Sequence, residues 1–179
     1  MNINFPSTRP CPAWREEDRL AALRDYEILD TEPEEAFEEI VKIAAHVFQA
    51  PISVVNFIAE GRQWFKAEIG LGIRETPLDI SICASAILQP GLFTVPDIRA
   101  DRRFSSFPGV TGEPGLRFYA GALLETPEGL PLGTVCVLDH QPRPEGVSPE
   151  QASTLLALAR CVMRELELKR SNKALARQT

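Results

Sequence analysis

The cysteines are the residues of this chain whose side chains are most suited to chemistry, and they stand at positions 11, 83, 136 and 161. Cys83 lies in DISICASAI, where a short helix is expected, and a thiol near a helix N-terminus has a lowered pKa. A redox-sensing or ligand-contacting thiol is one interpretation. The pattern favours the other, a small buried apolar side chain. Cys136 alternates with valines in GTVCVLD, so core packing is favoured there, as it is for Cys161.

The cysteines and histidines of the sequence give little support to metal or acid–base catalysis. The cysteines are widely spread without a C-x-x-C pair, and the chain has two histidines, His46 and His140. A zinc site or a disulfide framework is therefore disfavoured. For His46, a position at the surface or boundary of its helix is favoured over haem ligation. His140 follows Asp139 directly, and adjacent residues of a strand point apart, so they form no dyad. We expect no catalytic residues, metal or haem.

The run VPDIRADRRF contains carboxylates and arginines that could bind a charged ligand. Arginine clamps carboxylates or phosphates with two hydrogen bonds. An internal ion pair or a solvated loop is the favoured interpretation, and Asp97 is expected to cap the turn that follows it.

These residues must be positioned by helices and strands that the pattern predicts. Helical spacing predicts helices over 15–26 and from Thr31, a plausible N-cap, to Pro51. Alternating apolar residues predict strands over 52–59 and 62–69 around the turn Glu60-Gly61.

The second half of the chain continues with a short helix capped by Asp79 or Ser81. A strand over 91–97 and an irregular segment with one helical turn follow. The run LRFYAGALLETPEGLPLGTVCVLD (116–139) predicts a hairpin. Ser148 is expected to cap a helix of about thirty residues in which Leu168 and Leu175 are one heptad apart, with Asn172 at the core-type position between them.

This order predicts an α+β fold, with helices from both ends of the chain covering one face of an antiparallel sheet. The irregular segment over 70–115 must then cover the other face, where a small-molecule pocket can form. Trp64 and Phe65 point to opposite faces, as do Phe118 and Tyr119, so one of each pair faces the pocket. The candidate ligand-binding residues are Trp64, Cys83, Asp97, Arg103, Phe104, Phe118, Tyr119 and Cys136.

Composition narrows the classes of partner. The 179 residues are 44% hydrophobic and carry a net charge of −6. This acidic balance argues against nucleic-acid or anionic-membrane binding. No apolar run reaches the length of a spanning helix and no signal-peptide core is present, so a cytoplasmic protein is expected.

The chain resembles the GAF domain in six stretches that follow one another in the right order. They are ALRDYEILDTEPEEAFEEI, RQWFKAEIGL, ETPLDISICASAI, VPDIRADRRFSSFPGV, the hairpin and the closing helix. The closest likeness is to those at the N-terminus of bacterial sensor histidine kinases and diguanylate cyclases. The resemblance implies a six-stranded antiparallel sheet, a pocket on the face away from the terminal helices, and a homodimer. It also implies a histidine kinase or diguanylate cyclase as the output domain, hence two-component or cyclic di-GMP signalling.

The chain departs from several ligand-binding types of that family. It has no N-K-x-F-D-E run of the cyclic-nucleotide type and lacks the dense cysteines of the free methionine sulfoxide reductases. Cys83 is followed by Ala84 instead of a histidine, so no covalent bilin is expected. The ligand is thus an unknown small molecule.

We therefore expect a flexible leader over 1–14, a GAF domain over 15–170 and the end of a signalling helix over 171–179. The expected function is a non-catalytic sensory domain that signals through its terminal helices. Two alternatives stay open. One is a ligandless dimerisation module, and the other is a thiol-based reductase of a small oxidised metabolite that uses Cys83 with Cys136 as resolving partner.

Overall fold

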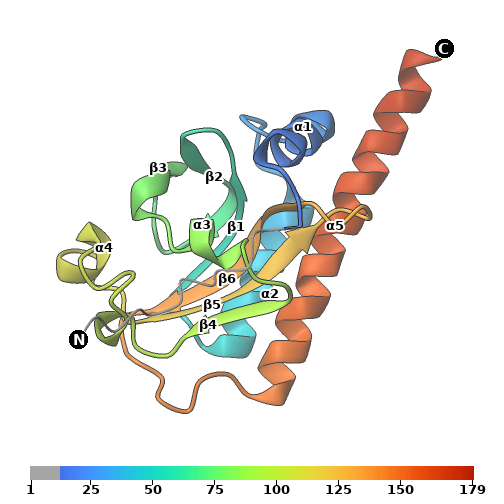
Figure 1. The fold of residues 1–179 in the computed structure, drawn as a ribbon. Helices are drawn as coiled ribbons and strands as arrows, with labels where there is room; N and C mark the ends of the chain where they lie inside the picture. Colours follow the sequence, from blue (N-terminus) through green and yellow to red (C-terminus); the bar gives the residue numbers. More distant parts are fainter. Residues whose placement is uncertain (1–12) are drawn as a thin grey trace.

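The computed structural model describes residues 13–179, so the predicted leader lies almost wholly outside the described residues. The six strands are β1 (Ile52–Ile58), β2 (Arg62–Ile69), β3 (Glu75–Pro77), β4 (Leu92–Val95), β5 (Phe118–Glu125) and β6 (Pro131–Asp139). They pair antiparallel in the order β3-β2-β1-β6-β5-β4 (Figure 1). The predicted six-stranded antiparallel sheet is confirmed.

The helices within the described residues are α1 (Glu16–Tyr26), α2 (Glu35–Phe48), α3 (Cys83–Ala86), α4 (Pro108–Thr111) and α5 (Pro149–Arg177). Single 3₁₀ turns precede α3 at Leu78–Ile80 and follow β4 at Ile98–Ala100. Ser81 accepts a hydrogen bond from the backbone N–H of Ala84 and Asp97 accepts one from that of Arg99, as predicted.

The two long helices begin differently. Ser148 and Gln151 form a reciprocal capping box at the start of α5, which confirms the predicted cap. The predicted Thr31 cap of α2 is wrong, because α2 begins after Glu34, whose side chain makes no cap hydrogen bond. The Thr31 hydroxyl instead donates to the Ile28 carbonyl and accepts from Lys66, which holds the loop before α2.

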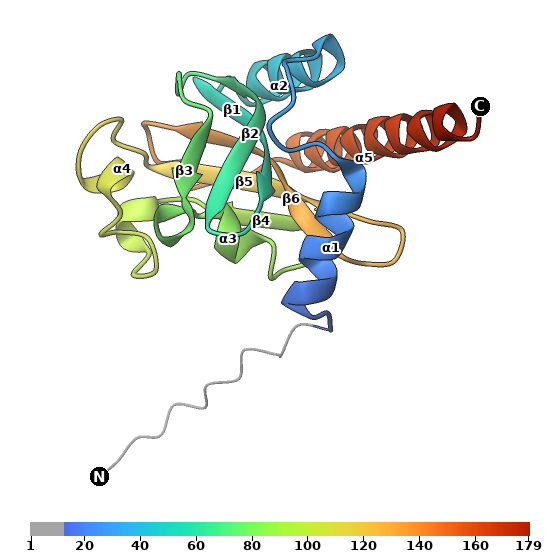
Figure 2. The same ribbon diagram turned by 90° about the horizontal axis from the view of Figure 1, so that it is seen from above.

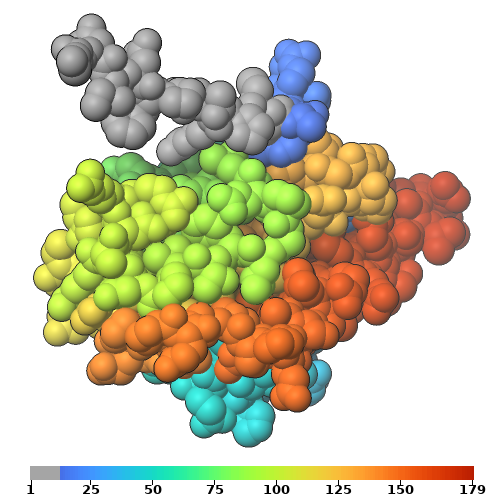
Figure 3. Space-filling model, turned by 60° about the horizontal axis from the view of Figure 1, so that its bottom comes forward, coloured from blue at the N-terminus to red at the C-terminus, as the bar shows by residue number. Residues whose placement is uncertain are grey.

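The sheet separates two apolar layers. Helices α1, α2 and α5 pack on one face, with Phe37, Val41, Leu155 and Val162 among their buried side chains. The segment from β3 to α4 covers the other face, as Figure 2 shows from above. In Figure 3 this segment, in green and yellow, forms a continuous layer. The arrangement confirms the prediction that residues 70–115 cover the face opposite the helices.

Three charged residues join the sheet to α5. The ammonium of Lys66 on β2 is fully buried and lies 2.7 Å from the Glu34 carboxylate, which also binds Lys169 of α5. Partial burial raises the pKa of Glu34, but the hydrogen bonds from Lys169 and Lys66 outweigh this effect and hold it below its usual range. The sheet, the start of α2 and α5 therefore share one ionic contact.

The distal part of α5 extends beyond the sheet (Figure 1). Leu168 and Leu175 on this part are 56% and 63% exposed, although each is a large apolar side chain. Arg177 and Lys173 reach back to Glu27 at the end of α1. Cys161 is exposed on α5, so its predicted core position is wrong.

Candidate functional site

A cavity of about 290 Å³ lies between the sheet and the segment that covers it. Its lining begins at the surface with exposed residues such as Ile73, Pro108 and Glu113. It ends on the sheet at the buried side chains of Tyr119 and Cys136. The remaining lining is mostly apolar: Val54, Phe65, Leu71, Ile80, Ile82, Pro114, Leu116 and Leu138, with Gln63, Thr76, Ser81, Cys83 and Gly109 between them.

Five buried polar side chains form a cluster at the inner end of this cavity, here called the thiol cluster: Asn56, Cys83, Tyr119, Thr134 and Cys136. The Sγ atoms of Cys83 and Cys136 are 3.9 Å apart, and the Tyr119 hydroxyl lies 3.1 Å from the Cys83 sulfur. Thr134 and Asn56 each donate to that sulfur at 3.4 Å. Three strands, β1, β5 and β6, thus place side chains around the thiol that α3 carries.

Glycine makes room for the tyrosine of the cluster. A Cβ atom at Gly121, two residues along β5 on the same face, would lie 2.4 Å from the Tyr119 hydroxyl oxygen. Because this position has no side chain, the Tyr119 ring can lie along the strand and reach the thiol.

The two cysteines differ in acidity. Burial raises the pKa of Cys83, but hydrogen bonds from Cys136, Thr134, Tyr119 and Asn56 to its sulfur outweigh burial and lower the pKa below that of an ordinary thiol. The pKa of Cys136 is raised by its hydrogen bond with the Cys83 thiol and by burial. Helix α3 has only one turn, so these hydrogen bonds replace the helix dipole as the reason for the predicted acidity of Cys83.

Asn56 and Thr134 are members that the sequence reasoning missed. The Asn56 amide nitrogen donates to the Thr134 hydroxyl at 2.8 Å. The amide oxygen of Asn56 is buried without a hydrogen-bond partner among residues 13–179. A polar residue within the apolar run PISVVNFI was the available signal, because a buried amide needs partners.

Trp64 and Phe118 do not line the cavity, which corrects two of the candidate residues. Both pack in the helix-side layer, where Trp64 stacks near Phe57 and Phe118 lies under Arg143. Phe65 and Tyr119, their neighbours in the chain, face the cavity. The rule that each pair splits between faces is confirmed, but two of the chosen members were on the wrong face.

The charged loop is also separate from the cavity. Asp97 pairs with Arg117 and Arg103 pairs with Asp101, so the favoured interpretation of internal ion pairs holds. The Arg103 guanidinium also lies 4.9 Å from the centre of the Phe104 ring.

Phe104 itself is buried edge-on against Phe93 and Phe107 and is not among the residues that line the cavity. Of the eight candidates, the structure brings Cys83, Tyr119 and Cys136 together at the cavity.

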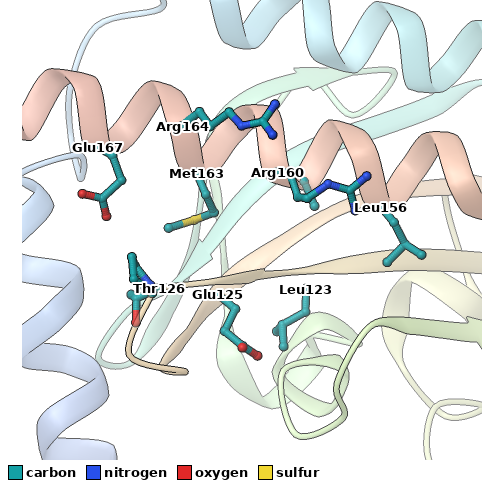
Figure 4. Close-up of a pocket in the computed structure, with 10 residues that line it drawn as sticks. Leu123, Glu125, Thr126, Leu156, Arg160, Met163, Arg164 and Glu167 are labelled. Atoms are coloured by element: carbon teal, nitrogen blue, oxygen red, sulfur yellow. The ribbon is translucent and has the colours of Figure 1, made fainter.

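A second, more open hollow of about 470 Å³ lies between α5 and the end of β5. Figure 4 shows Leu156 and Met163 of α5 directed toward Leu123 and Thr126, with arginines and glutamates at its rim. It contains no thiol or aromatic cluster, so we treat it as a groove along α5 and the thiol-cluster cavity as the candidate site.

Comparison with known proteins agrees with this architecture. The family model described as "GAF domain" matches residues 32–166, which is most of the chain. The chain belongs to the GAF domain family. A cyclic di-GMP phosphodiesterase of Pseudomonas aeruginosa is 44% identical over 165 residues, which are 92% of this chain. The chain spans 28% of that relative's length.

Solved structures of GAF domains share the fold at low sequence identity. The GAF domain of a phosphoenolpyruvate-protein phosphotransferase from Coxiella burnetii has a TM-score of 0.65 and 15% identity, covering 88% of this chain and 98% of that one. A free methionine-R-sulfoxide reductase from Neisseria meningitidis, solved with its substrate, has a TM-score of 0.61 and 14% identity. That match covers 90% of this chain and 98% of that chain.

Two further observations concern this GAF domain as described over residues 13–179. No three His, Cys, Asp or Glu side chains converge in a way that would hold a metal ion. None of its helices combines the length and the apolarity that crossing a membrane requires.

Proposed function

We propose that this GAF domain is a non-catalytic sensor that binds a small molecule in the thiol-cluster cavity and signals through α5. The observation that carries the proposal is a mostly apolar cavity with a few converging polar groups at its inner end, which is typical of small-molecule sites. Asn56 does not itself line the cavity, but it donates hydrogen bonds to the two cysteines that do.

The dimensions of the cavity limit the ligand. The cavity volume of about 290 Å³ lies just below the roughly 300–1,000 Å³ of small-molecule pockets. A dinucleotide such as cyclic di-GMP is much larger than this space. A compact, largely apolar metabolite with one or two polar groups fits best, with its polar end toward Tyr119 and Gln63 and its apolar part against Phe65 and Leu138.

The sheet provides a route from the cavity to α5. Tyr119 and Cys136 face the cavity, and their chain neighbours Phe118, Val135 and Val137 face the helices. A ligand that displaces β5 or β6 therefore changes the surface on which α5 packs. Signalling requires that the ligand bind two arrangements of α5 with different affinity.

We infer a homodimer, and a cyclic di-GMP phosphodiesterase as the output. The exposed Leu168 and Leu175 on the projecting part of α5 support the dimer, since apolar side chains at heptad spacing are typical of paired helices. The relative's name supports the output, because 92% of this chain is similar to part of a cyclic di-GMP phosphodiesterase. A histidine kinase or a diguanylate cyclase remains an alternative output.

Two other functions have specific support. The cavity volume falls just under the ligand-pocket range, as a ligandless dimerisation module would require. The 3.9 Å between the two sulfurs suits a thiol reductase with Cys136 as resolving partner. Reduction of a small sulfoxide, with Cys83→Ser as the inactive control, tests the second alternative.

Ligand screening by thermal shift tests the sensor. We expect compact apolar metabolites to raise the melting temperature of the wild-type protein, since a ligand at a hundred times its Kd adds about 2.7 kcal/mol. Val54→Phe, which places a larger side chain in the cavity, should abolish the shift. Leu156→Phe in the groove along α5 is the matched control and should keep it. A shift that survives Val54→Phe and is lost in Leu156→Phe would move the site to the groove.

A further inference from the structure

The two thiols of the cluster come from parts of the fold that differ in freedom to move. Cys136 lies in β6, which pairs with β1 on one side and β5 on the other. Cys83 is the first residue of α3, a single turn within the irregular cover. A disulfide needs an S–S distance of about 2.05 Å, so the observed 3.9 Å must shorten. Movement of α3 toward the fixed sheet can supply the difference.

Small reagents can reach this pair through the cavity. Cys83 and Cys136 are 3% and 1% exposed, but both line the cavity that begins at Ile73, Pro108 and Glu113. Among the three cysteines in the described residues, Cys161 is the exposed one and lies on α5, away from the pair. Access through the cavity therefore favours a small, uncharged oxidant over a protein or a bulky disulfide.

We propose that Cys83 and Cys136 are a site of reversible oxidation by small hydroperoxides, in which Cys83 is the nucleophile and Cys136 the resolving cysteine. The Cys83 thiolate attacks one peroxide oxygen, the O–O bond breaks, and the sulfur is oxidised to a sulfenic acid while the other oxygen leaves as an alcohol or water after taking a proton. Cys136 then attacks the Cys83 sulfur, loses its proton, and displaces hydroxide, which leaves as water. Two thiols and one hydroperoxide thus become one disulfide, one alcohol and one water.

The surroundings of the pair suit these steps. Tyr119, Thr134 and Asn56 place their polar atoms within 3.1–3.4 Å of the Cys83 sulfur, where they stabilise a thiolate. Cys136 receives a weaker contact, from Asn56 at 3.7 Å. Hydrogen bonds that gather on one sulfur select Cys83 for the first step, and the 3.9 Å separation places Cys136 for the second.

Oxidation would change the shape of the cavity and so would link the two cysteines to sensing. Because closing the disulfide draws α3 toward β6, the inner end of the cavity becomes smaller. The oxidised domain should therefore bind the cavity ligand less tightly than the reduced domain. Formation of the disulfide itself is expected even if the cavity binds no ligand, so the two proposals fail independently.

The test uses the whole chain, reduced, desalted and then treated with hydrogen peroxide. Free thiols are alkylated and the digested protein is mapped by mass spectrometry. We expect a peptide that joins Cys83 to Cys136, and dithiothreitol should reverse the link. Cys161→Ser should form the same link. In Cys136→Ser the reaction should stop at a Cys83 sulfenic acid, which dimedone captures.

If a variant does not fold, the mass-spectrometric peptide map of the wild-type protein is enough to decide the proposal. Alkylation of both Cys83 and Cys136 after peroxide treatment that oxidises Cys161 would overturn it. A disulfide from Cys83 to Cys161 or Cys11 would overturn it equally. Dimedone capture at Cys136 instead of Cys83 would reverse the assigned roles and contradict the proposed order of attack.

Discussion

Gly133→Ala is expected to abolish the stable fold. Gly133 lies opposite Phe57 in the central β1–β6 pair, and a Cβ atom there would lie 1.9 Å from the Asn56 carbonyl oxygen and 2.8 Å from Phe57 Cα. Both atoms belong to the backbone, so no side chain can rotate away. Separating these strands should cost more than about 4 kcal/mol, which is exceptional for one substitution and comparable to the roughly 5–15 kcal/mol that stabilise a whole domain.

Gly129→Ala is the matched control for this experiment. Gly129 lies in the β5–β6 turn with φ of 85°, and a Cβ there would have no atom within 4 Å. Its cost is that of the left-handed backbone alone, about 1–2 kcal/mol. Denaturant unfolding measured by circular dichroism compares the two variants. A Gly133→Ala protein as stable as Gly129→Ala would show that β1 and β6 are not packed as described.

The double substitution Leu168→Glu, Leu175→Glu is expected to convert the proposed homodimer into monomers without unfolding the domain. Both side chains are more than half exposed in the single chain, so their loss removes little from its own core. Burial of a leucine in an interface contributes about 1.5–3 kcal/mol, and the pair should therefore weaken self-association at least about a hundredfold.

Sedimentation equilibrium measures this change directly. Leu88→Glu, at an exposed leucine just after α3, is the control and should leave the association constant unchanged. Equal dimerisation of the double variant and the wild type would place the interface elsewhere, with the groove lined by Leu156 and Met163 as the next surface to alter.

Much of the fold could be predicted because single turns and alternation are local properties. Both hairpins, the capping box at Ser148 and the two-sided cover of the sheet follow from residues near one another in the chain. Strand β3 was missed because three residues, ETP, contain no alternation, and their pairing depends on β2, where Arg62 binds Glu75. The predicted Thr31 cap was wrong because α2 begins only after Glu34. The Thr31 hydroxyl instead accepts a hydrogen bond from Lys66, which is distant in sequence.

The site was less predictable because it depends on which face each residue occupies. Alternation places Trp64 and Phe65 on opposite faces but does not say which face is the cavity. In β2 the register also shifts at Lys66, since Asn56 pairs with Phe65 and Val55 with Ala67. No local signal marks that bulge. The approach of Cys83 to Cys136 joins residues far apart in the chain, so sequence reasoning could only name them as the sensible pair.

Protein purified without added ligand shows best whether the thiol-cluster cavity holds a small molecule. The folded protein's absorption spectrum is recorded, the protein is denatured, and the released small molecules are identified by mass spectrometry, with Val54→Phe treated identically. We expect a compact, largely apolar compound to be released in proportion to the wild-type protein and to be absent from Val54→Phe. A wild-type protein that releases nothing and shows no thermal shift with any screened metabolite would contradict ligand binding in the cavity and favour the ligandless dimerisation module.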